Sequence, residues 1–447
     1  MLRVILTALT LTRAGDGLPV KSPTEVGMSS TRLNAIERVV ERGIKAGGYP
    51  GASVIVGRKG AAVFEKGFGK LSWNESSTAV DAQRTIYDIA SLSKVVGTTT
   101  AIMILYDENK IRLDDPVVNY IPTFGGGDKD QVTIRQLLTH TSGLPAGRDI
   151  WRIAQTPLEA RALVLNTPLE GRPGAQYIYS DLGADVLGLL IEVVSGEPLD
   201  KFLTRRVFEP LGMNETMYRP ADSLRYRIAP TEVTPPRGYP LRGEVHDENA
   251  YALGGVAGHA GLFSTAADLS VFAQMMLNGG EYNGVQIISK PTVELFTSRA
   301  FGHRALGWDT AEGDYGSGRY LGPTAYGHTG FTGTSMWIDP EREMFVILLT
   351  NRVHAARALR PAKVISDVRA DLSDAAVLSV LDGPKLTAGS KAFRADREVG
   401  WNPPPRASRR RHGSSKHHSI ASATSRSRGS TSKKSSSSKK RSSKKSH

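Results

Sequence analysis

Patterns typical of β-strands occur near both ends of this chain and enclose a long, mostly helical middle. The runs GASVIVG (51–57) and AAVFEKG (61–67) are separated only by Arg58, Lys59 and Gly60, which predicts a β-hairpin. Three similar runs lie near the C-terminus: AYGHTG (325–330), GTSMWID (333–339) and MFVILLTN (344–351). We expect these runs to pair in one antiparallel sheet, because each strand must bury an apolar face.

Helical periodicity accounts for most of the remaining chain. A helix is predicted to begin near Ser29 and to end before Gly47, because the apolar residues between them fall on one face. Residues 89–280 are mostly helical, and a last helix is expected over about 356–381. The sequence therefore predicts an α/β (α+β type) fold: an antiparallel sheet built from both chain ends and flanked by helices, with a mostly helical inserted subdomain.

Residues 401–447 differ sharply in composition from the rest of the chain. They contain sixteen Ser, fourteen Lys or Arg and no acidic residue, so 43 basic and 44 acidic residues remain in the other 400 positions. The net charge of +13 therefore belongs to this segment. A segment with so little apolar surface is expected to be disordered. We predict a folded domain at 25–385, with its helical insertion at 89–280, and a basic tail at 386–447.

Cysteine content and hydropathy exclude some classes of protein. The chain has no cysteine, so it has no disulfide, thiolate metal site or cysteine nucleophile. No run approaches the roughly 20 apolar residues of a membrane span. The start, MLRVILTALTLTRAGDG, predicts either a short signal peptide or a disordered N-terminus over residues 1–24. A signal peptide would place the protein outside the cytoplasm (periplasmic, secreted or in the cell envelope); a cytoplasmic location stays open.

A serine and a lysine lie three residues apart in DIASLSKVVG (88–97), where an apolar helix begins. Positions three apart share one face of a helix, so Ser91 and Lys94 are expected to be neighbours. Burial would lower the pKa of the lysine, which could then accept a proton from the hydroxyl. Alone, this spacing also fits a helix cap beside a solvated lysine. Ser93 points to another side of the helix, so we do not choose it.

Two further segments contain groups that suit the same chemistry. Tyr179 precedes a helix that starts at Ser180 or Asp181, where a phenol can act as a base or proton relay. The segment AYGHTGFTG (325–333) has small side chains, which let a ligand approach the backbone closely. Its N–H groups could also contribute to an oxyanion hole. Alone, Tyr179 fits a core tyrosine and the His-Thr-Gly stretch fits a β-turn.

Together, the three segments resemble the serine β-lactamase and penicillin-binding protein superfamily, specifically its class C-like branch. That branch includes D-alanyl-D-alanine carboxypeptidases and family VIII-type esterases. Its motifs S-x-x-K, Y-x-N and K-T-G or H-T-G correspond, in order, to Ser91-Leu-Ser-Lys94, Tyr179-Ser-Asp181 and His328-Thr329-Gly330. Further segments resemble the same branch: LLTHTSGLP (137–145), the 254–272 stretch GGVAGHAGLFSTAADLSVF and the turn at 113–116. The resemblance extends over roughly residues 25–380.

The resemblance implies a serine hydrolase that forms an acyl-enzyme on Ser91 and needs no cofactor or metal. Lys94 and Tyr179 would handle the proton, and the backbone N–H groups of Ser91 and, by its strand position, Phe331 would form the oxyanion hole. The other motif residues would contact the substrate: Asp181, His328, Thr329 and Gly330. The expected substrates are small carboxylic esters or D-amino-acid peptides.

Two departures from the motifs bear on substrate choice. Asp181 replaces the usual Asn, so a carboxylate near Lys94 could keep the lysine charged. His328 replaces the Lys of true class C β-lactamases, and a histidine is not a fixed positive charge at neutral pH. Both departures argue against efficient destruction of β-lactam antibiotics.

Other functions remain open from the sequence. The alternatives on the same scaffold are a weak β-lactamase and a catalytically silent penicillin-binding-type protein. The chain has no G-x-S-x-G and no H-E-x-x-H motif, and His246 and His259 are too isolated to indicate a metal site. The tail lacks interleaved aromatic residues, so we expect only unspecific binding to anionic polymers or membrane surfaces, and no specific nucleic acid.

Overall fold

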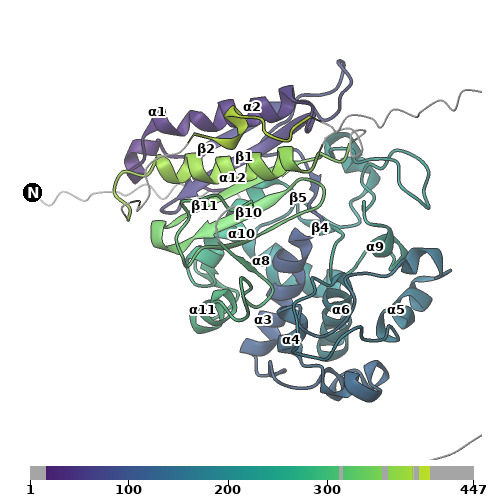
Figure 1. The fold of residues 1–447 in the computed structure, drawn as a ribbon. Coiled ribbons are helices and arrows are strands. Elements are labelled where there is room, and N and C mark those ends of the chain that lie inside the picture. Colours follow the sequence, from purple (N-terminus) through teal and green to yellow (C-terminus); the bar gives the residue numbers. More distant parts are fainter. Residues whose placement is uncertain (1–16, 312–315, 355–360, 385, 387–391, 403–447) are drawn as a thin grey trace, which may run out of the picture. The chain divides into compact units, whose positions relative to one another are not determined.

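A six-stranded antiparallel sheet built from both ends of the chain forms the centre of the fold (Figure 1). The computed structural model describes residues 17–311, 316–354, 361–384, 386 and 392–402. The strands are, in spatial order, β2 (Ala61–Gly69), β1 (Gly51–Arg58), β11 (Met344–Thr350), β10 (Ser335–Asp339), β9 (Tyr326–Thr329) and β8 (Asp309–Thr310). The predicted hairpin and all three predicted C-terminal strands are present, which confirms the fold expected from the sequence.

Helices from the two ends of the chain cover one face of this sheet. Helix α2 (Ala35–Lys45) lies beside α12 (Lys363–Leu378), as Figure 1 shows. The two helices share an apolar core with alternate residues of the central strands, among them Val54, Val346 and Leu348. The predicted first helix is interrupted at Asn34, which separates α2 from the short α1 (Ser30–Leu33).

The opposite face of the sheet packs against the long middle of the chain. Helix α10 (Ala266–Leu277) contacts β1 and β11, and Ile55 and Ile347 point into this second core. The same core continues into the helical region: α3 (Thr100–Asp107), α4 (Ile134–Leu138), α5 (Pro157–Leu165), α6 (Asp181–Ser195), α7 (Leu199–Leu203), α8 (Glu209–Leu211), α9 (Glu248–Ala252) and α11 (Lys290–Thr297). The insertion is therefore joined to the sheet by a continuous apolar interior.

Small β-structures interrupt this helical region, which the sequence predicted as mostly helical. A three-stranded sheet consists of β3 (Tyr87–Asp88), β5 (Leu262–Ser264) and β4 (Met217–Tyr218). Strands β6 (Glu281–Tyr282) and β7 (Val285–Gln286) form a separate pair. The segment before Ser91 and the segment after His259 thus lie side by side, because β3 pairs with β5.

The folded body extends beyond its predicted end at residue 385. Residues 392–402 pack along α2 and α12, where Ala395 and Trp401 are buried. The Trp401 indole donates a hydrogen bond to Asp367 at 2.9 Å. We predicted this segment as part of the tail because it is mostly polar, and its sequence does not show that Ala395 and Trp401 are buried. Residues 387–391 and 403–447 of the predicted tail lie outside the described residues, as do residues 1–16 of the predicted N-terminal segment.

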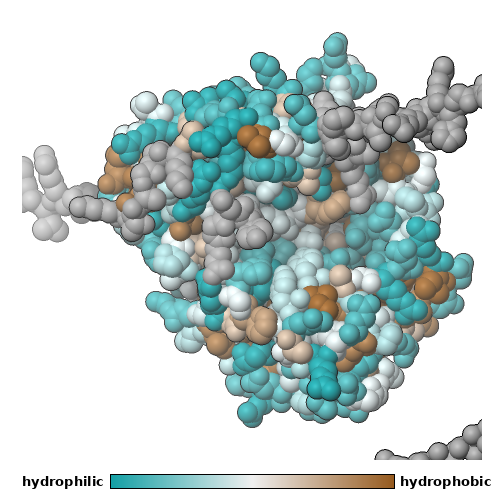
Figure 2. All heavy atoms as spheres, in the orientation of Figure 1, coloured by the Kyte–Doolittle hydropathy of each residue, from teal (hydrophilic) through white to brown (hydrophobic). Residues whose placement is uncertain are grey.

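The face of the described body that Figure 2 shows is largely polar. Figure 2 shows a mostly hydrophilic face on which hydrophobic residues appear in separate small patches, a common distribution for a folded protein surface. None of the helices in the described ranges combines the length and apolar character that a membrane span requires.

Candidate active site

Ser91 lies half-buried in a turn between β3 and the helix that contains Lys94. The preceding residue, Ala90, has a φ of +48°, in the left-handed region that costs a residue with a side chain about 1–2 kcal/mol. The Asp88 carboxylate stabilises this backbone by accepting the Ala90 N–H at 2.8 Å. Ser93 is fully buried and accepts a hydrogen bond from the Leu262 N–H at 3.1 Å. Of the two serines, only Ser91 faces a cavity.

Lys94 is buried and contacts three oxygen atoms. Its ammonium group lies 3.0 Å from Ser91 Oγ, 3.0 Å from the His259 carbonyl oxygen and 2.7 Å from Asp181 Oδ1. The contact with Ser91 has the i, i+3 spacing read from the sequence, although the backbone over Lys94–Thr99 is a π-helix. The contacts with Ser91 Oγ and with the His259 carbonyl are hydrogen bonds, and the contact with Asp181 is an ion pair.

The charge of Lys94 differs from the expectation raised by the S-x-x-K spacing. Burial alone lowers the pKa of Lys94, but the charges of Asp181 and Tyr179 and their hydrogen bonds outweigh it, so the pKa lies above its ordinary value. The depressed pKa expected from burial is therefore not found; the pKa follows the other expectation from the sequence, that Asp181 in place of Asn keeps the lysine charged. Lys94 is a cation at rest and donates to Ser91.

Tyr179 lies directly before α6, and the cap of that helix holds it in place. Ser180 caps α6 by accepting the Gly183 N–H, and its own N–H donates to His140 Nδ1 at 3.1 Å. The Tyr179 ring lies 4.6 Å from the His140 ring and 5.1 Å from the Lys94 ammonium. Burial and nearby cations lower the pKa of His140 well below its usual value, so this histidine is neutral.

Strand β9 forms the opposite wall of the site. His328 is buried, and its Nδ1–H donates to the Thr329 carbonyl at 2.8 Å. Burial lowers the pKa of His328 to about 4, in spite of the Asp309 carboxylate 4.0 Å away. The histidine of the third motif is consequently neutral near pH 7, and its Nε2 is left as a hydrogen-bond acceptor.

The turn between β9 and β10 approaches the Ser91 turn closely. Thr334 Oγ1 donates to the Ile89 carbonyl at 3.0 Å. Gly330 has no room for a side chain, because a Cβ there would overlap Thr334 Oγ1 and the same Ile89 carbonyl. From α12, Arg369 donates to the Gly330 and Thr334 carbonyls at 2.6 and 2.8 Å. Phe331 belongs to this turn and not to the strand, which corrects the strand position that we assigned to it.

These groups open into one cavity of about 480 Å³. Six of the eight residues predicted for the site line it: Ser91, Tyr179, His328, Thr329, Gly330 and Phe331. Three arginines also line it: Arg304, Arg352 and Arg369. Lys94 and Asp181 lie behind Ser91. Among the described residues, the lining contains three buried N–H groups without a hydrogen-bond partner: Arg304 Nε, Trp337 Nε1 and Arg369 Nε. Unpartnered buried donors are costly, so this cavity suits a ligand rich in acceptors.

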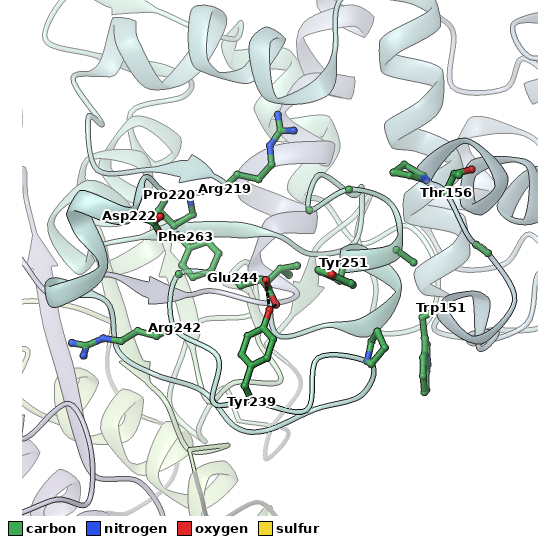
Figure 3. Close-up of a pocket in the computed structure, with 18 of the residues that line it drawn as sticks. Trp151, Thr156, Arg219, Pro220, Asp222, Tyr239, Arg242, Glu244, Tyr251 and Phe263 are labelled. Atoms are coloured by element: carbon green, nitrogen blue, oxygen red, sulfur yellow. Dashed lines mark hydrogen bonds between the residues drawn. The ribbon is translucent and has the colours of Figure 1, made fainter.

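A second, larger cavity of about 610 Å³ lies elsewhere in the helical region (Figure 3). Trp151, Tyr239 and Tyr251 contribute aromatic rings to it, and the Tyr239 hydroxyl donates to Glu244 at 3.0 Å. None of the predicted catalytic residues lines this cavity. Size alone therefore does not identify the reactive site, and we place the chemistry in the smaller cavity.

Four residues that the motifs did not identify also shape the site: His140, His259, Arg304 and Arg369. The two histidines occur in segments that resembled the family, 137–145 and 254–272, but no local pattern showed what they contact. The two arginines have no local pattern at all. His246 and His259, which looked isolated, each contact a carboxylate, and no group of side chains in the described ranges could hold a metal ion.

A serine, a lysine and a tyrosine around one cavity, on an antiparallel sheet flanked by helices, define the serine β-lactamase and penicillin-binding protein superfamily. The chain belongs to the Beta-lactamase family, whose model matches residues 36–369. It is 33% identical over 397 residues to a putative D-alanyl-D-alanine carboxypeptidase of Escherichia coli strain K12, covering 79% of this chain and 91% of that protein. A protein of the same name from Salmonella typhi is 35% identical over 381 residues, covering 76% and 87%.

Solved structures of the same superfamily are similar in fold. An octameric penicillin-binding protein homologue from Pyrococcus abyssi has a TM-score of 0.58 and 25% identity, covering 71% of this chain and 73% of that chain. EstCE1, a hydrolase with promiscuous acyltransferase activity, has a TM-score of 0.62 and 22% identity, covering 78% and 99%. The second likeness shows the fold alone.

Proposed function

We propose that this chain is a serine acyl hydrolase that forms an acyl-enzyme on Ser91 and removes the C-terminal residue from D-amino-acid peptides. The observation that carries this proposal is the 3.0 Å contact between Ser91 and Lys94 beside a cavity with unpartnered N–H donors. A terminal carboxylate offers acceptors for Arg304 or Arg369. The names of the curated relatives, putative D-alanyl-D-alanine carboxypeptidases, favour the same substrates.

In the proposed first step, Ser91 Oγ attacks the scissile carbonyl carbon, and its proton passes to the Tyr179 oxygen while the Tyr179 hydroxyl passes its own proton to the nitrogen of the leaving amine. We do not assign that proton to Lys94, because the Asp181 carboxylate lies 2.7 Å from its ammonium group and the pKa of Lys94 lies above its ordinary value, so the lysine is already protonated. The ammonium stabilises the negative charge that develops on Ser91 Oγ. The backbone N–H groups of Ser91 and Phe331 receive the carbonyl oxygen as it becomes an oxyanion.

The remaining steps return the proton and release the acyl group. The protonated amine then leaves as the C–N bond breaks, and an ester remains on Ser91. A water then attacks this ester and passes a proton to the Tyr179 oxygen, while the Tyr179 hydroxyl passes its own proton to Ser91 Oγ. The ester bond breaks, which releases the acid and restores Ser91. Every proton moves between Ser91, Tyr179, water and the leaving group, so no cofactor is required.

Hydrolysis of carboxylic esters is the second candidate. A specific feature favours it: the Asp309 carboxylate pairs with Arg304 at the cavity wall, which reduces the positive charge available to a substrate carboxylate. An exposed aromatic side chain at the rim, Phe331, also offers apolar surface for a neutral acyl or alcohol group. Both reactions use the same acyl-enzyme. An extracytoplasmic location would suit the peptide substrate.

Intact-mass spectrometry tests the acyl-enzyme, and matched substrates test its specificity. A fluorescent penicillin should add one adduct to the wild-type protein and none to Ser91→Ala. An N-acylated D-alanyl-D-alanine should be cleaved at least about tenfold faster than its C-terminal amide, since one charge-assisted interaction is worth roughly that much. Equal rates, together with rapid cleavage of a p-nitrophenyl ester, would instead favour the esterase. An adduct on Ser91→Ala would refute the assigned nucleophile.

A further inference from the structure

A buried histidine lies behind Lys94, and none of the steps above uses its side chain. His259 is 2% exposed, and its carbonyl oxygen is one of the three oxygens that contact the Lys94 ammonium. Its ring lies between two carboxylates, with Nδ1 2.7 Å from Asp185 and Nε2 2.9 Å from Asp247. Since both ring nitrogens face acceptors, both carry protons, and the ring is an imidazolium.

The two carboxylates anchor the segment that contains His259 to two helices. Asp185 lies in α6 and also accepts the N–H groups of Gly258 and His259, at 3.1 and 3.3 Å. Asp247 is the N-cap of α9 and accepts the Ala250 N–H at 2.8 Å. Gly258 lies so close to α6 that a Cβ there would overlap the Ala184 carbonyl. The His259 carbonyl therefore has little freedom to move.

The same region is connected to the nucleophile. The N–H of His246, next to Asp247, donates to one oxygen of Asp88 at 2.7 Å. The other oxygen of Asp88 accepts the Ala90 N–H, directly before Ser91. Buried hydrogen bonds thus run from the His259 clamp to both Lys94 and the Ser91 turn, and such networks favour a single geometry.

We propose that His259 is a positioning residue: Asp185 and Asp247 clamp its ring so that its carbonyl oxygen holds the Lys94 ammonium in contact with Ser91. Without the clamp the carbonyl would shift, and Lys94 would lose one of three acceptors. A displacement of about 1 Å at a reacting group can reduce a rate about a hundredfold. This inference rests on the proposed function, because it assumes that Lys94 takes part in the reaction.

Two variants and one control test the proposal in the full-length protein. His259→Gln removes the clamped ring, whereas Asp247→Asn keeps the helix cap and one hydrogen bond but removes a charge. Glu192→Gln is the control, since it breaks an ion pair with Arg161 that also involves α6 but does not contact Lys94. We expect His259→Gln to reduce kcat about 10- to 100-fold at nearly constant KM, Asp247→Asn to reduce it less, and Glu192→Gln to leave it unchanged.

The pH dependence separates positioning from a merely structural role. Loss of the carbonyl contact destabilises the charged form of Lys94, so the alkaline limb of kcat/KM should move to lower pH in both clamp variants. The titratable groups that face Lys94 or the clamp come from four places: Asp181 and Asp185 of α6, Tyr179 directly before α6, His246 and Asp247 before α9, and Asp88 of β3. A lowered melting temperature with unchanged kcat and pH profile, or an equal shift in Glu192→Gln, would overturn the proposal.

A readout that needs no turnover separates this proposal from the proposed function. In protein labelled with ¹³C-lysine, the Cε signal that disappears in Lys94→Ala reports the titration of Lys94. We expect its midpoint to fall in His259→Gln and in Asp247→Asn; an unchanged midpoint in the folded variants overturns the positioning role even if no substrate is cleaved. If His259→Gln does not fold, Asp247→Asn decides the question.

Discussion

At the scale of single residues, Asp181 affects the proposed chemistry through the charge of Lys94. In this chain it stands where the motif of the superfamily has Asn, and its carboxylate lies 2.7 Å from the Lys94 ammonium. Burial alone would lower the pKa of Lys94, and the Asp181 carboxylate, together with Tyr179, reverses the direction of the shift. The same S-x-x-K spacing can therefore place either a neutral base or a fixed cation beside the serine.

The substitution Asp181→Asn tests this reversal. Without the carboxylate, burial dominates and the pKa of Lys94 falls, so Lys94 loses its proton at a lower pH. If Lys94 acts as a cation, the alkaline limb of the kcat/KM profile moves down in pH, and a profile over pH 6–11 measures the shift. A gain in activity near neutral pH would show instead that neutral Lys94 is the base.

Ser91→Ala and Ser93→Ala should have opposite effects on activity and stability. Ser91→Ala removes the nucleophile and should reduce ester turnover at least about a thousandfold, with an unchanged melting temperature. Ser93→Ala removes the acceptor of the buried Leu262 N–H and should reduce the free energy of unfolding by about 1–3 kcal/mol, with activity retained. Turnover assays and thermal unfolding check both, and a reversed result would mean that Ser93 is the nucleophile.

At the scale of secondary-structure elements, the site depends on how closely the β9–β10 turn approaches the Ser91 turn. Three hydrogen bonds from threonine or arginine side chains join the two turns or hold the β9–β10 turn to α12: Thr332 to Asp88, Thr334 to Ile89 and Arg369 to Gly330. The proposed oxyanion donors belong to these two turns, so their separation sets the width of the hole. Helix α12 thus supports the site as well as covering the sheet.

Gly330→Ala should widen that separation. A Cβ at this position overlaps the Ile89 carbonyl, which is backbone and cannot move aside as a flexible side chain would. We expect a loss of kcat of about tenfold or more and a lower melting temperature, because overpacking costs about 1–3 kcal/mol. Gly147→Ala is a matched control, since a Cβ there contacts nothing within 4 Å. Wild-type activity in Gly330→Ala would show that the two turns tolerate separation.

At the scale of the whole molecule, the C-terminal segment 392–402 is part of the folded body. Arg394 pairs with Asp371 and Asp374 at 3.0 and 3.1 Å, and burial raises the pKa of each of these carboxyls to about 6. Trp401 adds a buried ring against α12. The segment therefore compensates buried charge on the helix that also carries Arg369.

Two truncated proteins should differ in stability. A chain that ends after residue 402 should unfold at the wild-type temperature. A chain that ends after residue 386 loses Trp401 and both Arg394 pairs, so the buried Asp371 and Asp374 lose this cation, although Asp374 keeps its contact with Arg319. Its free energy of unfolding should fall by at least about 3 kcal/mol. Calorimetry measures both. Equal melting temperatures would mean that 392–402 contributes nothing to the fold.

Truncation after residue 402 also tests the basic tail, which the sequence alone describes. Because all fourteen cationic residues of 401–447 lie beyond 402, the shortened chain should lose salt-sensitive binding to heparin or acidic vesicles. Hydrolysis of a small soluble ester should be unchanged. Retained heparin binding after truncation would locate the anion-binding surface on the folded body.

The sequence by itself determined the architecture and the three segments that form the site. Strand alternation, the Lys59–Gly60 turn and the i, i+3 spacing of Ser91 and Lys94 are local properties, so they can be read from neighbouring residues. The order of the three motifs then indicated the superfamily. The sequence could not show where residues 392–402 pack, because two buried side chains in a mostly polar segment do not form a periodic apolar pattern.

Only the tertiary structure decided the state of the ionisable groups and the position of the turns. The charge of Lys94 depends on Asp181, and the charge of His259 depends on Asp185 and Asp247, which are distant in sequence but within 3 Å in space. A pKa is set by burial and by charges within a few ångströms, whatever their separation along the chain. That physical reason is why the motifs located the site, whereas only the fold assigned protons and partners to its residues.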